Sequence, residues 1–253
     1  MIPNYLIIGV QKSGTTSMIN YFNQHPQIFL YEDEIHFFDS YQYLKGKEYY
    51  ENIFKKKMPK NKKFIGEKTP SYCFIPLCVP RIQKMYPTIK MIMVLREPIQ
   101  RCFSQYMMIC KKNNIKASNQ HFYDTIKSIE HIKLKDITST QGYYYLQRGF
   151  YDEQIRHLYK YFPRKNIYIG VFEIIKENQE KEYNKMYEFI GASTSDTIDY
   201  SEIERKGEYE FELSLENKQY LYSIYKKHNV KLYKILGYPI KEWEDYYKKN
   251  LII

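Results

Sequence analysis

Several features that define common protein classes are scarce or missing in this sequence. Its 253 residues contain no run of about eighteen apolar residues, so no transmembrane helix is predicted. The apolar run Tyr5–Ile8 leads directly into a glycine-containing loop, without the basic start and cleavage site of a signal peptide. The cysteines show no CxxC pair and no histidine at metal-binding spacing, so we expect no metal site. Reduced thiols in a cytoplasmic protein are the resulting expectation.

The composition is otherwise that of a folded domain with a basic surplus. Hydrophobic residues make up 43% and charged residues 27% of the chain, which excludes a disordered tail. Lysine and arginine total 39 against 29 acidic residues, a formal net charge of +10. Such a charge favours an anionic partner, which by this criterion alone is a nucleotide, a polysaccharide, a nucleic acid or an acidic membrane.

Apolar runs alternate with helical patterns along the whole chain. Buried strands are predicted at residues 5–9, 90–95 and 167–171. Helices are predicted from Gly14 to before Pro26, after Pro98, and over residues 151–161, 180–190 and 214–236. Strands that alternate with helices form parallel sheets covered on both faces. We therefore expect an α/β fold in which residues 1–253 form a single P-loop-like domain, with a central parallel sheet and helices on both faces.

The first loop has the features of a phosphate site. The segment Gly9–Ser17 (GVQKSGTTS) joins a strand to a helix, so backbone N–H groups and the helix dipole point at one spot. Its G-x-x-x-x-G spacing is that of a nucleoside-triphosphate P-loop, but Thr15 stands where the lysine should follow, and the lysine comes earlier. No strand ends in the aspartate of a Walker B motif. The expected phosphate-binding residues are Lys12, Ser13, Gly14, Thr15, Thr16 and Ser17.

A second motif follows the strand at residues 90–95. Arg96 stands at the carboxyl end of this strand, where ligands bind in open α/β sheets. Ser104 lies eight residues later, two turns along the next helix. An arginine fork and a hydroxyl together suit a second phosphate group.

These two motifs, in this order, resemble the sulfotransferase superfamily, whose members use 3′-phosphoadenosine 5′-phosphosulfate (PAPS) and release adenosine 3′,5′-bisphosphate. The resemblance implies that Lys12–Ser17 hold the 5′-phosphosulfate and that Arg96 and Ser104 hold the 3′-phosphate. Residues 32–39 (EDEIHFFD) and 66–72 (GEKTPSY) are similar to segments of the heparan sulfate (glucosaminyl) sulfotransferases. Lys206 and Gly207 lie where the family has a Lys-Gly loop that closes over the nucleotide.

The sequence departs from that branch in three places. Glu208 stands where the family loop has an arginine, and residues 192–204 lack the cysteines of the hairpin in the animal enzymes. The Golgi anchor of the animal enzymes is also not seen. Because of Glu208, only Lys206 and Gly207 are carried over to the nucleotide loop. The other two differences concern the heparan acceptor and leave the transfer chemistry unchanged.

The resemblance implies sulfuryl transfer to a hydroxyl or amine of a carbohydrate-like acceptor, without a metal. Glu34 is the expected general base, with Glu32 as the competing assignment, and His36 lies on the same side of an extended segment. Lys12 is expected to neutralise charge on the leaving phosphate oxygen, and Lys68 charge on the sulfuryl group or the acceptor side.

Two other functions remain open from the sequence alone. One is a magnesium-dependent small-molecule P-loop kinase, and the other is a non-catalytic protein that binds polyanions through its net charge. Two separate anion sites argue against the second, because generic polyanion binding needs no such pairing. We expect no nucleic-acid partner, and the sequence does not distinguish O-sulfation from N-sulfation or define the oligomeric state.

Overall fold

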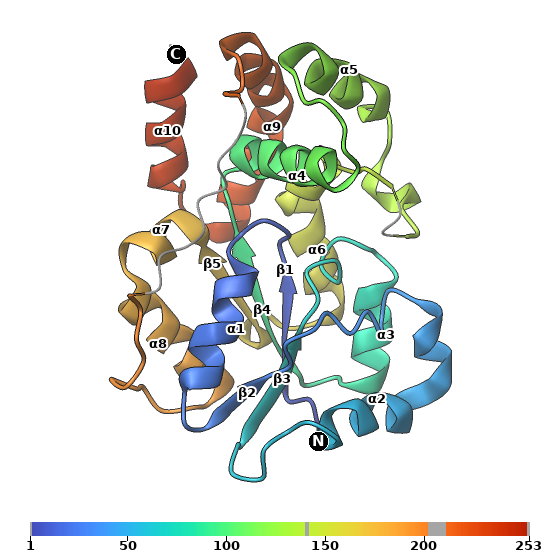
Figure 1. Ribbon diagram of the computed structural model, residues 1–253, viewed down its shortest axis with the longest axis vertical. Coiled ribbons are helices and arrows are strands. Elements are labelled where there is room, and N and C mark those ends of the chain that lie inside the picture. The colour runs from blue at the N-terminus through green and yellow to red at the C-terminus, as the bar shows by residue number, and fades with distance from the viewer. Residues whose placement is uncertain (1, 140–141, 202–210, 252–253) are drawn as a thin grey trace.

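A computed structural model describes residues 2–139, 142–201 and 211–251 of the chain. Its centre is a five-stranded sheet in the order β2-β3-β1-β4-β5 (Figure 1). Every neighbouring pair of strands is parallel, which confirms the predicted parallel sheet. The strands are β1 (Tyr5–Gly9), β2 (Ile28–Leu30), β3 (Phe64–Lys68), β4 (Lys90–Leu95) and β5 (Ile167–Val171).

Most of the described residues outside the sheet are helical, and the predicted helices are all present. The α-helices are α1 (Thr15–Gln24), α2 (Gly46–Lys55), α3 (Cys78–Met85), α4 (Pro98–Lys112), α5 (Asn119–Ile129), α6 (Tyr151–Tyr161), α7 (Phe172–Glu177), α8 (Gln179–Ile190), α9 (Leu215–Leu236) and α10 (Lys241–Leu251). Short 3-10 turns are η1 (Tyr41–Lys45), η2 (Leu134–Asp136), η3 (Gln147–Gly149) and η4 (Arg164–Asn166). The sequence did not predict the short strand β2 or helices α2, α3, α5, α7 and α10.

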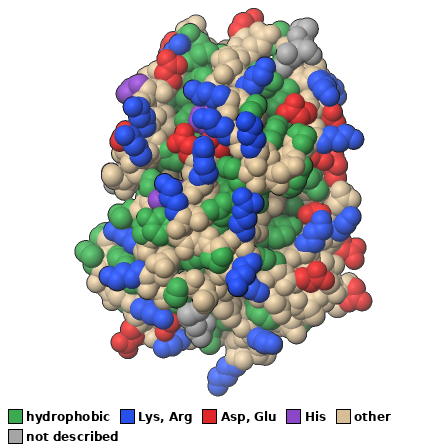
Figure 2. Space-filling view, turned by 180° about the vertical axis from the view of Figure 1, so that it is seen from behind, with side chains coloured by type: hydrophobic (Ala, Val, Ile, Leu, Met, Phe, Trp, Pro, Cys, Tyr) green, Lys and Arg blue, Asp and Glu red, His purple; other side chains and the backbone are tan. Residues whose placement is uncertain are grey.

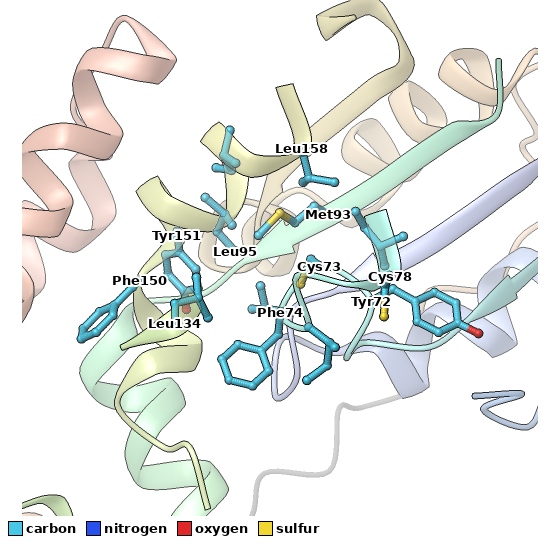
Figure 3. Packing of buried hydrophobic residues seen from close by; sticks show 14 of the residues in the cluster. Tyr72, Cys73, Phe74, Cys78, Met93, Leu95, Leu134, Phe150, Tyr151 and Leu158 are labelled. Atoms are coloured by element: carbon cyan, nitrogen blue, oxygen red, sulfur yellow. The ribbon is translucent and has the colours of Figure 1, made fainter. Parts of the chain in front are cut away.

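Helices cover both faces of the sheet, as expected. Tyr5 and Ile7 of β1 pack against α1 and α8 on one face. Leu6 and Ile8 point to the opposite face, because side chains alternate along a strand, and join a larger core that includes residues of α3 and α6. Figure 1 shows α1, α7 and α8 on one side of the sheet and α2, α3 and α6 on the other. Figure 3 shows part of the larger core, where the segment after β3 packs beside β4.

The strand order determines where a ligand site can form. β1 lies at the centre of the sheet, with β3 and β2 on one side and β4 and β5 on the other. The connections that leave β1 and β4 run in opposite directions, so a topological switch point lies between these two strands. Ligands of open parallel sheets bind outside the carboxyl ends of the strands at this point. In the register, Ile7 of β1 is opposite Lys68 of β3 and Ile92 of β4. The loops after β1, β3 and β4 therefore start side by side.

Three further observations concern membrane-spanning helices, the thiols and the surface charge. Among the described residues, no helix has both the length and the apolarity needed to cross a membrane. The four cysteines are free and buried. On the face seen in Figure 2, lysine and arginine side chains are spread from one end to the other instead of forming a single patch.

Candidate active site

The loop after β1 presents an open helix N-terminus. Lys12 and Gly14 adopt left-handed backbone conformations, with φ of +75° and +76°, and the Ser13 hydroxyl donates a 2.6 Å hydrogen bond to the Val10 carbonyl. Gly14 is the N-cap of α1, and it provides no side chain to cap the free N–H groups of the first turn. That turn also has no acidic residue. These N–H groups and the positive helix end are therefore available to an anion.

Gly9, at the end of β1, allows the segment after β3 to approach closely. A Cβ atom at this position would lie 2.3 Å from the Cys73 sulfur and 3.1 Å from the Pro70 carbonyl oxygen. Its φ of +154° is also unfavourable for other residues. Glycine is thus required here, because Pro70 and Cys73 of the segment after β3 pack directly against the end of β1.

Lys12 carries a positive charge without a carboxylate partner among the described residues. Its Nζ lies 3.8 Å from the Met108 sulfur of α4, a weak contact. Burial lowers the pKa of Lys12, and the positive charges of Arg96 and Arg101 lower it further. An ammonium group surrounded by other cations has a strong electrostatic preference for a bound anion.

Arg96 joins the loop after β4 to the loop after β1. Its Nη1 donates a 2.8 Å hydrogen bond to the Lys12 carbonyl, and its guanidinium lies 5.0 Å from the centre of the Phe172 ring. The Nε of Arg96 is buried without a described partner. A cavity of about 450 Å³ opens beside Arg96, and Phe103 and Lys218 contribute to its lining. This arginine therefore has donor capacity left for a ligand.

Helix α4 is held firmly at its start, which positions Arg96. The buried Glu97 side chain accepts hydrogen bonds from the backbone N–H groups of Ile99 at 3.0 Å and Gln100 at 2.7 Å, a side-chain N-cap. The Tyr247 hydroxyl of α10 donates to the same carboxylate at 2.9 Å. Ser104 follows on α4 and is 3% exposed. Arg96 directly precedes this anchored helix start, and Ser104 lies within the helix.

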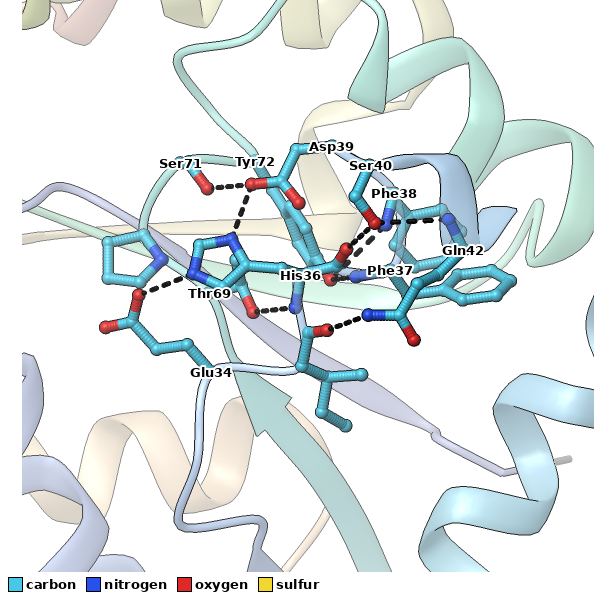
Figure 4. Close-up of polar contacts among 12 residues, drawn as sticks. Glu34, His36, Phe37, Phe38, Asp39, Ser40, Gln42, Thr69, Ser71 and Tyr72 are labelled. Carbon is cyan, nitrogen blue, oxygen red and sulfur yellow. Dashed lines mark hydrogen bonds and ion pairs between the residues drawn. The ribbon is translucent and has the colours of Figure 1, made fainter. Parts of the chain in front are cut away.

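A chain of polar contacts links Glu34, His36 and Asp39 (Figure 4). Glu34 lies 3.2 Å from the Lys68 Nζ and 3.3 Å from the His36 Nε2. The other ring nitrogen of His36 lies 2.8 Å from Asp39, whose carboxylate also accepts a hydrogen bond from Ser71. The structure therefore brings together three residues that the sequence predicts to be catalytic, namely Glu34, His36 and Lys68.

A buried hydrogen-bond network around Glu67 holds the segments that carry Glu34, His36 and Lys68 together. The Glu67 carboxylate is fully buried and accepts hydrogen bonds from Thr69 at 2.6 Å, from Tyr72 at 2.9 Å and from Tyr50. The Tyr72 hydroxyl in turn accepts a 2.9 Å hydrogen bond from the Phe37 backbone N–H. This network ties the end of β3, and hence Lys68, to the segment that carries His36.

The contacts set the charges of the site at neutral pH. Burial alone would raise the pKa of Glu34, but the hydrogen bond from His36 and the charge of Lys68 hold it below its usual value. Asp39, and then Glu34, raise the pKa of His36 to about 10. The site therefore contains a carboxylate and an imidazolium. The backbone of His36 has a φ of +52°, and such strain is typical of functional positions.

The structure gives less support to the other residues that the sequence singled out. Glu32 is exposed, and no described residue forms a hydrogen bond or an ion pair with it. Lys206 and Gly207 lie outside the described residues. One group within the described part has the spacing of metal ligands, namely Asp152, Glu153 and His228 on α6 and α9. Asp152 is already paired with Arg156 and His228, so the expected absence of a metal stays a prediction.

Sequence reasoning missed three residues around the site. Asp39 ends one of the two segments that resemble the heparan sulfate branch, and its spacing of three from His36 is a usable signal, but no role was predicted for it. Arg101 and Arg148, both buried, were not predicted either. Arg148 follows a tyrosine-rich stretch with no pattern that marks it, so only the structure locates it.

The fold and the site together define a P-loop-like α/β enzyme for group transfer, with the cations Lys12 and Arg96 after β1 and β4 and a carboxylate beside β3. The sulfotransferase domain family matches residues 3–236, and the chain belongs to this family. The predicted family is thereby confirmed.

Curated relatives include enzymes of the predicted branch. The chain is 26% identical to the membrane-associated sulfotransferase kil1 of Dictyostelium discoideum over 320 aligned residues, which cover 96% of the chain and 67% of that protein. It is 33% identical to heparan sulfate glucosamine 3-O-sulfotransferase 5 of Mus musculus over 172 residues, 66% of the chain. The alignment covers 47% of the mouse enzyme, so the chain matches about half of this relative.

A solved structure has the same fold. The crystal structure of a sulfotransferase from Alicyclobacillus acidocaldarius aligns with a TM-score of 0.80 over 96% of the chain and 99% of its own length. At a sequence identity of 23%, this match shows that the two proteins share a fold.

Proposed function

We propose that the protein transfers a sulfuryl group from PAPS to a hydroxyl or amine of a carbohydrate-like acceptor, with Glu34 as the general base. One observation carries the proposal: the cations Lys12 and Arg96 follow β1 and β4, and the pair Glu34 and Lys68 lies at the end of the neighbouring strand β3. Donor and acceptor groups would therefore meet at the carboxyl edge of the sheet.

The residues present fit a nucleotide that is phosphorylated at both ends. The open N-terminus of α1 and the ammonium of Lys12, which has no carboxylate partner among the described residues, suit the 5′ end, with Ser13, Gly14, Thr15, Thr16 and Ser17 around them. The free Nε of Arg96 suits the 3′-phosphate, together with Ser104. By family resemblance, Lys206 and Gly207 would complete this site. When bound, PAPS supplies an activated sulfuryl group whose leaving group is a phosphate.

The other residues have distinct tasks in the proposed reaction. Glu34 takes the proton from the acceptor oxygen or nitrogen, because it is ionised and 40% exposed. His36 is held by Asp39 and orients the Glu34 carboxylate. Lys68 and Lys12 place positive charge where negative charge develops. A saccharide is the favoured acceptor, since relatives in the family are named heparan sulfate glucosamine sulfotransferases.

Binding of the bisphosphate provides the first test. The wild-type protein should bind adenosine 3′,5′-bisphosphate at least about tenfold more tightly than AMP, because only the bisphosphate occupies both anion sites. Arg96→Ala should lose about tenfold in affinity for the bisphosphate and stay within about twofold for AMP. Isothermal titration calorimetry with the four protein–ligand pairs measures both effects.

Arg164→Ala is the matched control for this test. Arg164 precedes β5 at the amino edge of the sheet, opposite to the edge that carries Arg96, and stacks on Tyr159. This variant should bind both nucleotides like the wild type. Equal wild-type affinities for the bisphosphate and AMP would remove the two-site assignment.

Metal removal separates the proposed reaction from that of a kinase. Transfer should proceed unchanged in EDTA, because the loop lacks the lysine followed by Ser/Thr that presents Mg²⁺ to a triphosphate. Product formation is followed with and without EDTA and then after addition of Mg²⁺, with PAPS and ATP as alternative donors. Activity with ATP that EDTA abolishes and Mg²⁺ restores would support the kinase instead.

A further inference from the structure

The short helical turn η1 and the start of α2 expose large apolar side chains. Leu44 is 82% exposed and Tyr41 is 76% exposed, the two highest values among the large hydrophobic residues that the structure describes. Tyr49 of α2 is exposed as well. Single exposed apolar residues are common on protein surfaces. Here three of them lie within nine residues, and together with Lys45 they form what we call the η1 surface.

Lys45 places a positive charge in the middle of this surface. Its Nζ lies 4.4 Å from the centre of the Tyr49 ring and 5.9 Å from that of the Tyr41 ring. It also donates a 3.3 Å hydrogen bond to the Tyr49 hydroxyl. Within the described part of the chain, no carboxylate pairs with Lys45. The ammonium group therefore lies over two tyrosine rings, and its charge is not neutralised.

The neighbouring residues extend the positive charge. Residues 41–57 contain five lysines and two glutamates. Lys55 and Lys56, at the end of α2, are exposed, and Lys47 is 3.9 Å from Glu51. Such a lysine excess attracts an anionic surface and repels a second copy of itself.

The rest of the segment is anchored, which keeps the exposed side chains in place. The Ser40 side chain caps η1, and Arg81 of α3 donates a 2.7 Å hydrogen bond to the Phe38 carbonyl just before it. Tyr50 and Phe54 of α2 are fully buried in the larger core. Figure 1 shows α2 at the periphery of the molecule, on the same side of the sheet as α3. The exposed cluster is therefore a surface of the folded domain.

We propose that the η1 surface docks the protein on an anionic lipid membrane, with Leu44 and the tyrosine rings among the lipids and the lysines at the headgroups. Tyrosine suits the membrane interface, because its ring is apolar and its hydroxyl is polar. Lysine stems cover apolar surface while their charges reach anionic headgroups. A membrane is favoured over a soluble polyanion because Leu44, the most exposed residue of the cluster, has only apolar side-chain atoms. Docking on this surface does not depend on the proposed reaction.

Vesicle binding tests the proposal with the full chain. The protein is mixed with vesicles of phosphatidylcholine alone and with vesicles that also contain about 30% phosphatidylserine, and sedimentation of the vesicles gives the bound fraction. The wild type should bind the anionic vesicles at least about tenfold more strongly than the neutral ones. Added salt should weaken this binding, because part of it is electrostatic.

Substitutions separate the η1 surface from the net charge of the protein. Leu44→Ser should weaken binding to the anionic vesicles by about tenfold or more, and Lys45→Gln by about fivefold. Both variants should melt at the wild-type temperature, since the two side chains are exposed. Val230→Ser and Lys226→Gln are the matched controls on α9. Val230 is 47% exposed, and Lys226 lies over the Tyr222 ring as Lys45 lies over its tyrosines. These controls should bind the vesicles like the wild type.

A fluorescent label reports whether the cluster enters the lipid. The four native cysteines are buried, so Leu44→Cys can be labelled selectively with an environment-sensitive dye. The emission should shift to the blue when anionic vesicles are added. The same label on Val230→Cys should show no shift.

Four results would overturn the proposal. The first is a wild-type protein that binds anionic vesicles no better than neutral ones. Equal losses in the η1 and α9 variants, or an unshifted label on vesicle-bound Leu44→Cys, would assign binding to the net charge. Binding of soluble dextran sulfate that depends on Leu44, without vesicle binding, would make the surface a polyanion site. Self-association that Leu44→Ser abolishes, again without vesicle binding, would make it a contact between copies of the chain.

Discussion

Glu34→Gln is expected to lower sulfuryl-transfer turnover by about 10²–10⁴-fold, the usual cost of removing a positioned general base. The affinity for adenosine 3′,5′-bisphosphate should stay within about twofold, because Glu34 contacts Lys68 and His36 and none of the residues assigned to the nucleotide. The fold should also persist, since the Glu34 side chain is 40% exposed. Steady-state kinetics, calorimetry and thermal melting of the same preparation measure the three quantities.

Glu32→Gln is the matched control, because it makes the same chemical change two residues earlier. Glu32 is exposed and has no described polar partner, so this variant should turn over like the wild type. A nearly inactive Glu32→Gln beside a nearly normal Glu34→Gln would reverse the assignment. A lower melting temperature that accompanies the loss of activity in Glu34→Gln would indicate a structural carboxylate.

The pH dependence of turnover follows from the shifted pKa values of Glu34 and His36. The pKa of Glu34 lies below its usual value of 4.5, so the base is ionised at neutral pH and activity falls only in acid, as the carboxylate becomes protonated. The pKa of His36 is about 10, so the imidazolium that pairs with Glu34 is lost as the pH rises through that value. A plateau between these limits is expected, and Glu34→Gln should lack the acid limb.

The same shift links His36 to stability. Its pKa is raised from the ordinary value of 6.5 to about 10 in the folded chain, so the folded state binds this proton more tightly than the unfolded state. The contribution of His36 to the free energy of unfolding is fully present below pH 6.5 and is lost as the pH rises towards 10. His36→Gln should therefore flatten this part of the stability curve, which thermal melting at a series of pH values measures.

The parts of the fold that the sequence predicted are those with a strong local signal. Strand β4 consists of six residues with an unbroken apolar run after Lys90, and helix α4 begins at Pro98 after the capping residue Glu97. Helix α10 was missed because its eleven residues are mostly polar. Its buried residues Trp243, Tyr247 and Leu251 recur every four positions, a helical signal that tyrosine obscures because it occurs in cores and on surfaces alike.

The residues of the candidate site also include some with a local sequence signal and some without one. Lys12 and Arg96 lie in motifs whose spacing along the chain reflects a local turn or helix start, and Glu34 lies in a segment assigned through its resemblance to the family. Arg148 joins the site through contacts with residues far away in the sequence, such as Phe74, and a single sequence has no pattern that records such contacts. Both arginines are buried, and the side-chain hydrogen bonds that distinguish Arg101 from Arg148 are a property of the folded chain alone.

Lys12→Met is expected to lower turnover by about 10²–10³-fold. The substitution removes the positive charge that would lie beside the leaving phosphate oxygen, on which negative charge develops. Methionine has nearly the length of the lysine stem and can keep the contact with Met108. It is also preferable to glycine, because the φ of +75° at this position would relax with glycine and add a backbone effect. The bisphosphate should bind with a smaller loss than turnover, since the backbone N–H groups of α1 remain.

Lys63→Met is the control for a lost lysine charge, because Lys63 is exposed and stacks over Phe64 at the amino end of β3. It should leave turnover unchanged. Pre-steady-state measurement of the transfer step separates chemistry from product release in both variants. If Lys12→Met weakens bisphosphate binding and turnover by the same factor, Lys12 acts in ground-state binding. If it transfers at the wild-type rate, the charge at the leaving oxygen must be neutralised by another group, and the candidate is Arg96, which bonds to the Lys12 carbonyl.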